Sequence, residues 1–244
     1  MPTGRRGAAA VALPGTYLGR LPQNARQELL ALGSERWYQH GEHLIVYGAR
    51  DRYAVVLRTG RVKVIATTPG GRTCLLGVRE PGDVVGELSI VDGRPRSASV
   101  VASGAVSARM ISDAAFSAFL DRHPRAVWEL TRVIGERLRV ADRRRIEFVY
   151  DVPTRVVCLL AEWVGARPGD RRERVEVRLT QREVAELVGA AEVTVQKAMR
   201  ALARTGLLAT NYGRIVVPSP ARLATEAQRL AQAHRFTAPG AAPR

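Results

Sequence analysis

Residues 180–204 carry polar side chains at a spacing that could hydrogen-bond the base edges of DNA. Thr180 and Glu183 have the T-x-x-E spacing of a capping box, which predicts that a helix starts at Thr180. Gly189 interrupts this helix, and a second amphipathic helix follows. Its apolar residues are Val195, Ala198, Met199 and Leu202, and its outer residues are Glu192, Val193, Gln196, Lys197 and Arg200. This pattern indicates a helix-turn-helix that reads DNA, the alternative being an ordinary helical hairpin in a helical domain.

Composition favours a polyanionic partner. The 244-residue chain has a net charge of +15, and nucleic acid is the commonest partner of so basic a surface. The only cysteines, Cys74 and Cys158, are too few and too far apart for a metal cluster or a disulfide framework, so we expect no metal site and a reducing cytoplasm. No stretch has the apolar length of a membrane span. We find no nucleophile–base pair and no phosphate-binding P-loop, and therefore expect no enzyme.

The residue pattern changes along the chain, and these changes predict the order of the secondary-structure elements. Short β-rich runs alternate with glycine turns over residues 36–112, which is typical of a small antiparallel barrel or sandwich. The pattern then becomes helical, and a hairpin at the end would form a wing. Besides the barrel strands, the expected elements are helices at 22–33, 114–120, 124–150 and 154–166, a strand at 175–179, the helix-turn-helix, and a hairpin at 206–218.

The long helix carries an apolar stripe at i, i+3 and i+4 spacing. Its members are Val127, Leu130, Ile134, Leu138 and Ala141. A helix of this length between two domains has little core of its own to bury against, so we expect the stripe to pair with a second copy of the chain. The alternative is that the stripe packs only on the barrel.

The order of barrel, long helix and winged helix-turn-helix resembles the Crp/Fnr family of bacterial transcription regulators, over about residues 20–220. A second motif, GELSIVDGRPRSA at 86–98, is similar to the phosphate-binding cassette of cyclic-nucleotide-binding domains. The resemblance implies an α+β fold with an N-terminal cyclic-nucleotide-binding-type β-barrel (jelly roll), a long dimerisation helix and a C-terminal winged helix-turn-helix. It also implies a cytoplasmic homodimer on double-stranded DNA, with cAMP or another nucleotide as effector and RNA polymerase as a candidate further partner.

The cassette residues have the chemistry that a phosphate needs. Gly86 permits close approach of the backbone, whose free N–H groups would face the phosphate. Arg96 supplies a planar, permanently charged fork, and Glu87 would accept a hydrogen bond from a ribose 2′-hydroxyl. The effector residues implied by the resemblance are Gly86, Glu87, Leu88, Arg96, Ser97 and Ala98, with Val64 and Leu76 on an apolar wall. For these last two residues the alternative is plain barrel core.

The base-reading half of this pocket departs from the family. In cAMP-responsive members, a threonine followed by a small polar residue on the long helix contacts the adenine. The matching positions here are Val140-Ala141 or Ala141-Asp142, which supply no threonine hydroxyl. Each unpaired polar group on a buried base costs about 1–3 kcal/mol. Three outcomes stay open: cAMP bound weakly or differently, another anionic nucleotide, or an empty pocket.

The reading helix departs as well. Ala191-Glu192-Val193 stands where well-known members have Ser-Arg-Glu, so we expect a different operator. Lys197 could pair with guanine and Gln196 with adenine. Further candidate base contacts are Val193 and Glu192, and the candidate phosphate contacts are Arg182, Thr194, Arg200, Tyr212 and Arg214. For Glu192 the alternative is a stabilising charge in the first helical turn.

We therefore expect a homodimeric transcription regulator in which an anionic effector shifts the population of DNA-competent dimers. The expected divisions are a disordered tail over 1–19, an effector domain over 20–123, a dimerisation helix over 124–151, the DNA-binding domain over 152–220 and a C-terminal tail over 221–244. Two alternatives remain: a relative that binds DNA constitutively with a relic pocket, and a nucleotide-binding regulatory subunit that acts through protein contacts.

Overall fold

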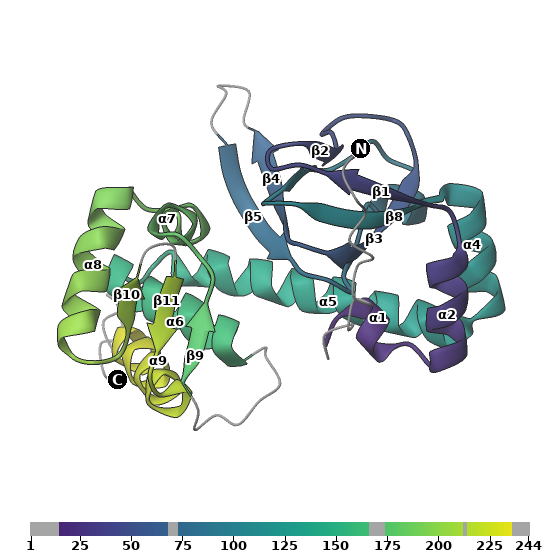
Figure 1. Ribbon diagram of the computed structural model, residues 1–244. Coiled ribbons are helices and arrows are strands. Elements are labelled where there is room, and N and C mark those ends of the chain that lie inside the picture. Colours follow the sequence, from purple (N-terminus) through teal and green to yellow (C-terminus); the bar gives the residue numbers. More distant parts are fainter. Residues whose placement is uncertain (1–14, 68–72, 166–173, 212–213, 236–244) are drawn as a thin grey trace, which may run out of the picture. The chain divides into compact units, whose positions relative to one another are not determined.

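The computed structural model describes residues 15–67, 73–165, 174–211 and 214–235 (Figure 1). The chain divides into two compact units, residues 1–137 and 138–244, and each is described by itself. In the described part of the chain, no helix combines the length and the apolar character needed to cross a membrane.

Two four-stranded antiparallel sheets form the centre of the first unit. One has the order β1 (Ser34–Tyr38), β8 (Val106–Ser112), β3 (Tyr53–Thr59) and β6 (Val84–Val85), and the other β2 (His43–Ile45), β7 (Ser99–Ala102), β4 (Val62–Thr67) and β5 (Thr73–Arg79). Buried residues of both sheets, including Leu44, Leu57, Val100 and Val106, belong to one core cluster. The sheets therefore pack face to face, which confirms the expected jelly roll, although the barrel is not fully closed.

Helices enclose a second core in the first unit. They are α1 (Tyr17–Arg20), α2 (Gln23–Ala31), α4 (Asp113–Arg122) and the start of α5 (Pro124–Glu147); the short α3 (Leu88–Val91) follows β6. Tyr17 is fully buried, its hydroxyl donates to the Ala126 carbonyl at 3.2 Å, and burial raises its pKa well above the usual value. The tail expected over 1–19 is therefore corrected at its end, because Tyr17 and Leu18 are core residues; residues 1–14 lie outside the described part.

The stripe of α5 is divided by this core. Leu130 is buried among the residues of α1, α2 and α4, and Ile134 packs against the same cluster. Val127, Leu138 and Ala141 are exposed. The first turns of α5 thus use part of the stripe within the unit, as the barrel-packing alternative stated, and the exposed members remain available to a partner.

The second unit surrounds helix α6 (Val152–Gly165). After it come β9 (Val175–Val177), α7 (Gln181–Val188), α8 (Glu192–Arg204), β10 (Ala209–Asn211), β11 (Arg214–Val217) and α9 (Pro220–Arg235), and the strands form a sheet of order β10-β11-β9. Helix α6 packs against α7, α8 and α9. The tail expected over 221–244 is corrected by α9, whose Leu223 is fully buried; residues 236–244 lie outside the described part.

The helix-turn-helix begins and turns where the sequence predicts. The Thr180 hydroxyl accepts from the Glu183 backbone N–H at 3.2 Å, and Glu183 Oε2 accepts from the Thr180 backbone N–H at 2.7 Å. Gly189 ends α7 with a φ of +66°, in the left-handed region that favours glycine, and its N–H donates to the Ala185 carbonyl. Local hydrogen bonds therefore fix both ends of the first helix of the motif.

Replacing Thr180 with Ala should lower the free energy of unfolding by about 1 kcal/mol, because α7 loses the side-chain acceptor at its N-terminus. Urea denaturation of the full chain measures this loss. Thr180→Ser keeps the hydroxyl and is the matched control. Equal destabilisation by both substitutions would contradict the capping role.

Candidate functional site

The cassette is built around the tight turn at Gly86. Its φ is +80°, and a Cβ atom placed there would lie within 3 Å of atoms of Ile45, Arg96 and Tyr53. Only glycine satisfies both the backbone conformation and the close approach. The turn leads directly into Glu87 and the short helix α3.

Arg96 is buried beside this turn, with 3% of its surface exposed. Its Nη1 donates to the Gly86 carbonyl at 2.8 Å and to Ser89 Oγ at 2.6 Å, and its Nη2 donates to the Tyr53 carbonyl at 3.0 Å. Its Nε donates to Asp51 Oδ1 at 3.2 Å, and the guanidinium carbon lies 4.3 Å from the centre of the Tyr53 ring. The guanidinium is thus oriented by protein acceptors and neutralised by one carboxylate.

Glu87 is also buried and already has a cationic partner. Arg137 Nη1, from helix α5, donates to Glu87 Oε1 at 2.7 Å, and Arg137 Nη2 donates to the Val84 carbonyl at 2.8 Å. Burial raises the pKa of the nearby Asp83 carboxyl, and the positive charge of Arg137 opposes that rise. The long helix therefore reaches the cassette through one arginine.

The remaining expected effector residues are less closely grouped. Ser97 is exposed, and Ala98, two residues after Arg96, is buried. Leu88 is exposed on α3, and Leu76 is exposed on β5, whereas Val64 on β4 packs against the core between the sheets. The core alternative therefore describes Val64 but not Leu76.

Sequence reasoning missed four residues that complete the cassette: Asp51, Tyr53, Ser89 and Arg137. One signal was available, since a buried carboxylate at Glu87 requires a cation. Sequence alone does not say which of the many arginines of this chain supplies it.

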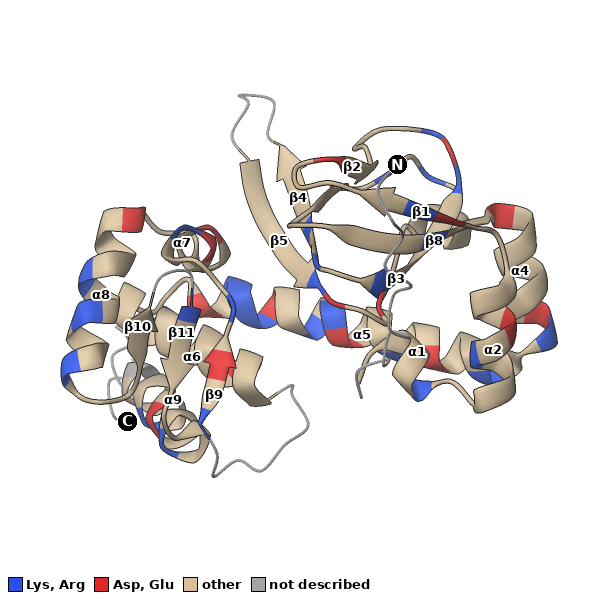
Figure 2. Ribbon diagram, viewed as in Figure 1, with Lys and Arg blue, Asp and Glu red and all other residues tan. Residues whose placement is uncertain are grey.

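Helix α8 presents a polar face. Val195, Ala198 and Met199 are buried, while Glu192, Val193, Thr194, Lys197 and Arg200 are exposed, as predicted. Figure 2 shows basic positions spaced along this helix. Gln196 is half-buried, and its Nε2 donates to Glu192 Oε1 at 3.3 Å, so these two candidate base readers are paired with each other.

The other candidate DNA contacts flank α8. Arg182 at the start of α7 is exposed and its Nε donates to Glu186 Oε1 at 3.1 Å, one turn along. Arg214 on the wing strand β11 donates to Glu176 Oε2 at 3.4 Å. Tyr212 lies outside the described residues.

These features define a class: a jelly-roll domain with a phosphate-type cassette and a winged helix-turn-helix with an exposed reading face. The sequence profile of the cyclic nucleotide-binding domain matches residues 35–123, and that of the Crp-like helix-turn-helix domain matches residues 154–226. The CRP-like cAMP-activated global transcriptional regulator of Mycobacterium tuberculosis is 34% identical over 182 residues, which are 73% of this chain and 80% of the relative. The chain belongs to the Crp/Fnr family and is a DNA-binding transcription regulator.

One further relative is similar in sequence, and one solved structure is similar in fold. The cyclic AMP receptor protein of Thermus thermophilus is 26% identical over 195 residues, 80% of this chain and 88% of the relative. The solved structure of FixK2 from Bradyrhizobium japonicum, at 20% identity, has a TM-score of 0.66 and covers 82% of this chain and 97% of its own. The latter shows the shared fold.

Replacing Arg137 with Met should lower the free energy of unfolding of the first unit by about 3–5 kcal/mol, because the Glu87 carboxylate is left buried without its cation. The double substitution Glu87→Gln with Arg137→Met should recover part of the loss. Urea denaturation measures both, with the exposed Arg125→Met as control. A loss no larger than that of the control would contradict the importance of the pair.

Proposed function

We propose that this regulator is a homodimer that reads its operator with helix α8 and that a small anionic nucleotide at the cassette modulates its affinity. The observation that carries the proposal is the presence of two features in one chain. One is an exposed polar helix face that follows the capped helix α7 and its glycine turn, and the other is a buried arginine and glutamate around Gly86. The first feature fits the major groove and the second fits a cyclic phosphate with its ribose.

The reading face suggests a division of contacts. We assign base contacts to Lys197 and Gln196, with Val193 and Glu192 as further base contacts. Phosphate contacts, which position a protein without specifying sequence, fall to Arg182, Thr194, Arg200, Tyr212 and Arg214. Glu192 in place of an arginine removes a guanine reader, which supports an operator unlike that of the well-known members.

The exposed part of the α5 stripe supports the homodimer. Val127, Leu138 and Ala141 lie on helix α5 and are open to solvent in the single chain. Pairing them with a second copy would bury this apolar surface and place two α8 helices about one turn of DNA apart. In this proposal the protein acts in the cytoplasm, with no catalytic role and with RNA polymerase as a further partner.

The effector site of this proposal is the buried Arg96 beside the Gly86 turn. A nucleotide phosphate at Arg96 would compete with Asp51, whose side chain is 53% exposed and therefore able to move away. A cyclic nucleotide such as cAMP is supported by the similarity to the cAMP-activated regulator of M. tuberculosis. The internal partners of Arg96 and Glu87 favour one alternative, a regulator that binds DNA without any effector.

Selection from a random duplex pool should yield an operator with two inverted half-sites. Lys197→Ala should cost about 1–3 kcal/mol and relax preference at one base pair, whereas Arg200→Ala should weaken all sequences alike and reduce the salt dependence by about one phosphate contact. Binding titrations at several salt concentrations separate the two effects. Failure to select any sequence would contradict operator reading.

Calorimetric titration with cAMP should show saturable binding that Arg96→Ala weakens by at least about tenfold, because the phosphate loses its charged fork. Arg94→Ala, an exposed arginine of the same loop, is the control. If neither cAMP nor another cyclic nucleotide binds to protein that still holds its operator, the effector-free alternative replaces the proposal.

A further inference from the structure

The linker between α5 and α6 lies against the turn of the helix-turn-helix, within the second unit. A Cβ atom at Gly189 would lie 2.9 Å from Cε1 and 3.0 Å from Cζ of Phe148. The edge of the Phe148 ring therefore covers the turn so closely that a side chain at position 189 would displace it. Gly189 is required here twice, for its left-handed φ and for this contact.

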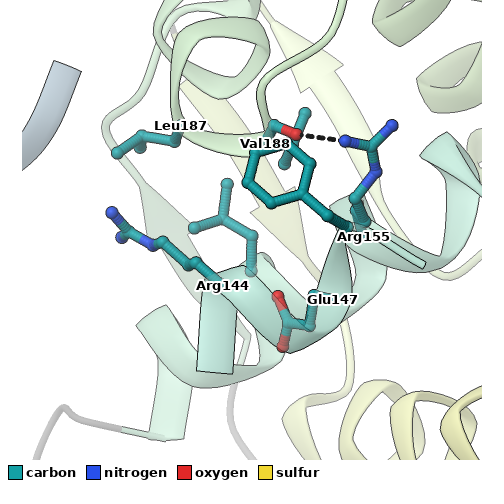
Figure 3. Close-up of a pocket in the computed structure, with 7 residues that line it drawn as sticks. Arg144, Glu147, Arg155, Leu187 and Val188 are labelled. Atoms are coloured by element: carbon teal, nitrogen blue, oxygen red, sulfur yellow. Dashed lines mark hydrogen bonds between the residues drawn. The ribbon is translucent and has the colours of Figure 1, made fainter. Parts of the chain in front are cut away.

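Arg155 of α6 contacts both the end of α7 and the Phe148 ring, and Figure 3 shows its hydrogen bond to Val188. Its Nη1 donates to the carbonyl of Val188, the last residue of α7, at 2.7 Å. This carbonyl has no partner within its own helix, and a cation favours the negative end of the helix dipole. The guanidinium carbon of Arg155 also lies 5.5 Å from the centre of the Phe148 ring, within the range of a cation–π contact.

The burial of these residues indicates a geometric role. Phe148 is 61% exposed, so it contributes little to the core of the unit. That core is made by fully buried residues of α6, α7 and α8, among them Val156, Leu160, Val184 and Met199. The Phe148 contact is therefore not needed to bury the core, yet the ring lies directly against the turn.

The contact is also close in sequence to helix α8, which carries the polar face. Only Gly189, Ala190 and Ala191 separate Val188 from Glu192, the first residue of α8. A displacement of the turn relative to the linker is consequently transmitted to α8 through three residues. Arg143 of α5 adds a weaker connection, with its Nη2 lying 3.6 Å from Glu162 Oε1 of α6.

We propose that Phe148, Arg155, Val188 and Gly189, here termed the hinge clamp, fix the direction of α8 relative to the end of α5 and thereby set the half-site spacing that the protein accepts. This inference rests on the proposed homodimer on an inverted repeat. The clamp residues are positioning residues, because none of them lies on α8 or is among the proposed DNA contacts.

The physical reason is the rotation of DNA with each base pair. Adding one base pair between half-sites turns one of them by about 35° and moves it by about 3.4 Å, given one turn per 10–10.5 base pairs. A dimer whose α5–α6 linkers are rigid binds both half-sites at one spacing only. A dimer whose linkers are loosened binds neighbouring spacings by rotating its DNA-binding units.

The experiment measures affinity for duplexes that carry the selected half-sites at the selected spacing and at spacings changed by one or two base pairs. For the full wild-type chain we expect binding at least about tenfold weaker at changed spacings. For Phe148→Ala, and for Phe148→Ala with Arg155→Ala, we expect differences within about threefold, with unchanged affinity for a single half-site. Arg155→Lys keeps a charged donor, so it should retain most of the loss of affinity at changed spacings, whereas Arg155→Ala should show a smaller loss.

Val149→Ala is the matched control, because Val149 is the next residue of the linker, is 75% exposed and has no part in the clamp. Variants that keep the full wild-type spacing penalty would overturn the clamp. A uniform loss on all duplexes, single half-sites included, would mean that the residues only support the fold and would also overturn it. A wild-type chain without any spacing preference would instead overturn the proposed homodimer, before any variant is compared.

Discussion

A buried carboxylate needs a cation, and this requirement connects the cassette to the long helix. Glu87 is buried immediately after the Gly86 turn, and Arg137 of α5 supplies its charge while also binding the Val84 carbonyl. Breaking such a pair costs far more than an exposed ion pair contributes, so the rotation of this part of α5 against the cassette is fixed. On the same helix, Glu136 receives two hydrogen bonds from Arg20 of α1. Any ligand that competes for Glu87 therefore acts on the helix as well.

Arginine side chains also stabilise this fold by donating hydrogen bonds to carbonyls at the ends of helices. Arg26 donates to the carbonyls of Leu18, Gly19 and Leu21 around the end of α1, and Arg109 donates to those of Ala31, Leu32 and Gly33 at the end of α2. Arg155 does the same for α7. Five donors in a planar fork suit a cluster of unpaired carbonyls. Part of the charge of +15 is therefore structural, and net charge alone overstates the DNA-binding surface.

Features that depend on neighbouring residues could be predicted from the sequence, and features that depend on distant partners could not. The capping box at Thr180, the turn at Gly189 and the cassette glycine each depend on a few neighbouring residues, and the structure has them as expected. The distant partners of Arg96 and Glu87, namely Asp51, Tyr53 and Arg137, lie 43 to 50 residues away along the chain, among many equivalent side chains. Helices α1 and α9 were missed because their flanks are rich in Ala, Pro and Gly, and only tertiary packing of Tyr17 and Leu223 reveals them.

If α8 reads DNA as proposed, the hydrogen bond between Gln196 and Glu192 affects which operators the protein can distinguish. In the free chain, the amide nitrogen of Gln196 donates to the Glu192 carboxylate, and the amide oxygen of Gln196 can act only as an acceptor. Two adjacent acceptors match the exocyclic amino groups of cytosine and adenine and oppose the acceptor edge of guanine. A carboxylate near DNA also repels phosphate, so off-target sequences that offer no amino group gain nothing to offset that repulsion. Specificity would then arise at Glu192 from rejection of wrong sequences, while Lys197 and the flanking arginines supply the attraction.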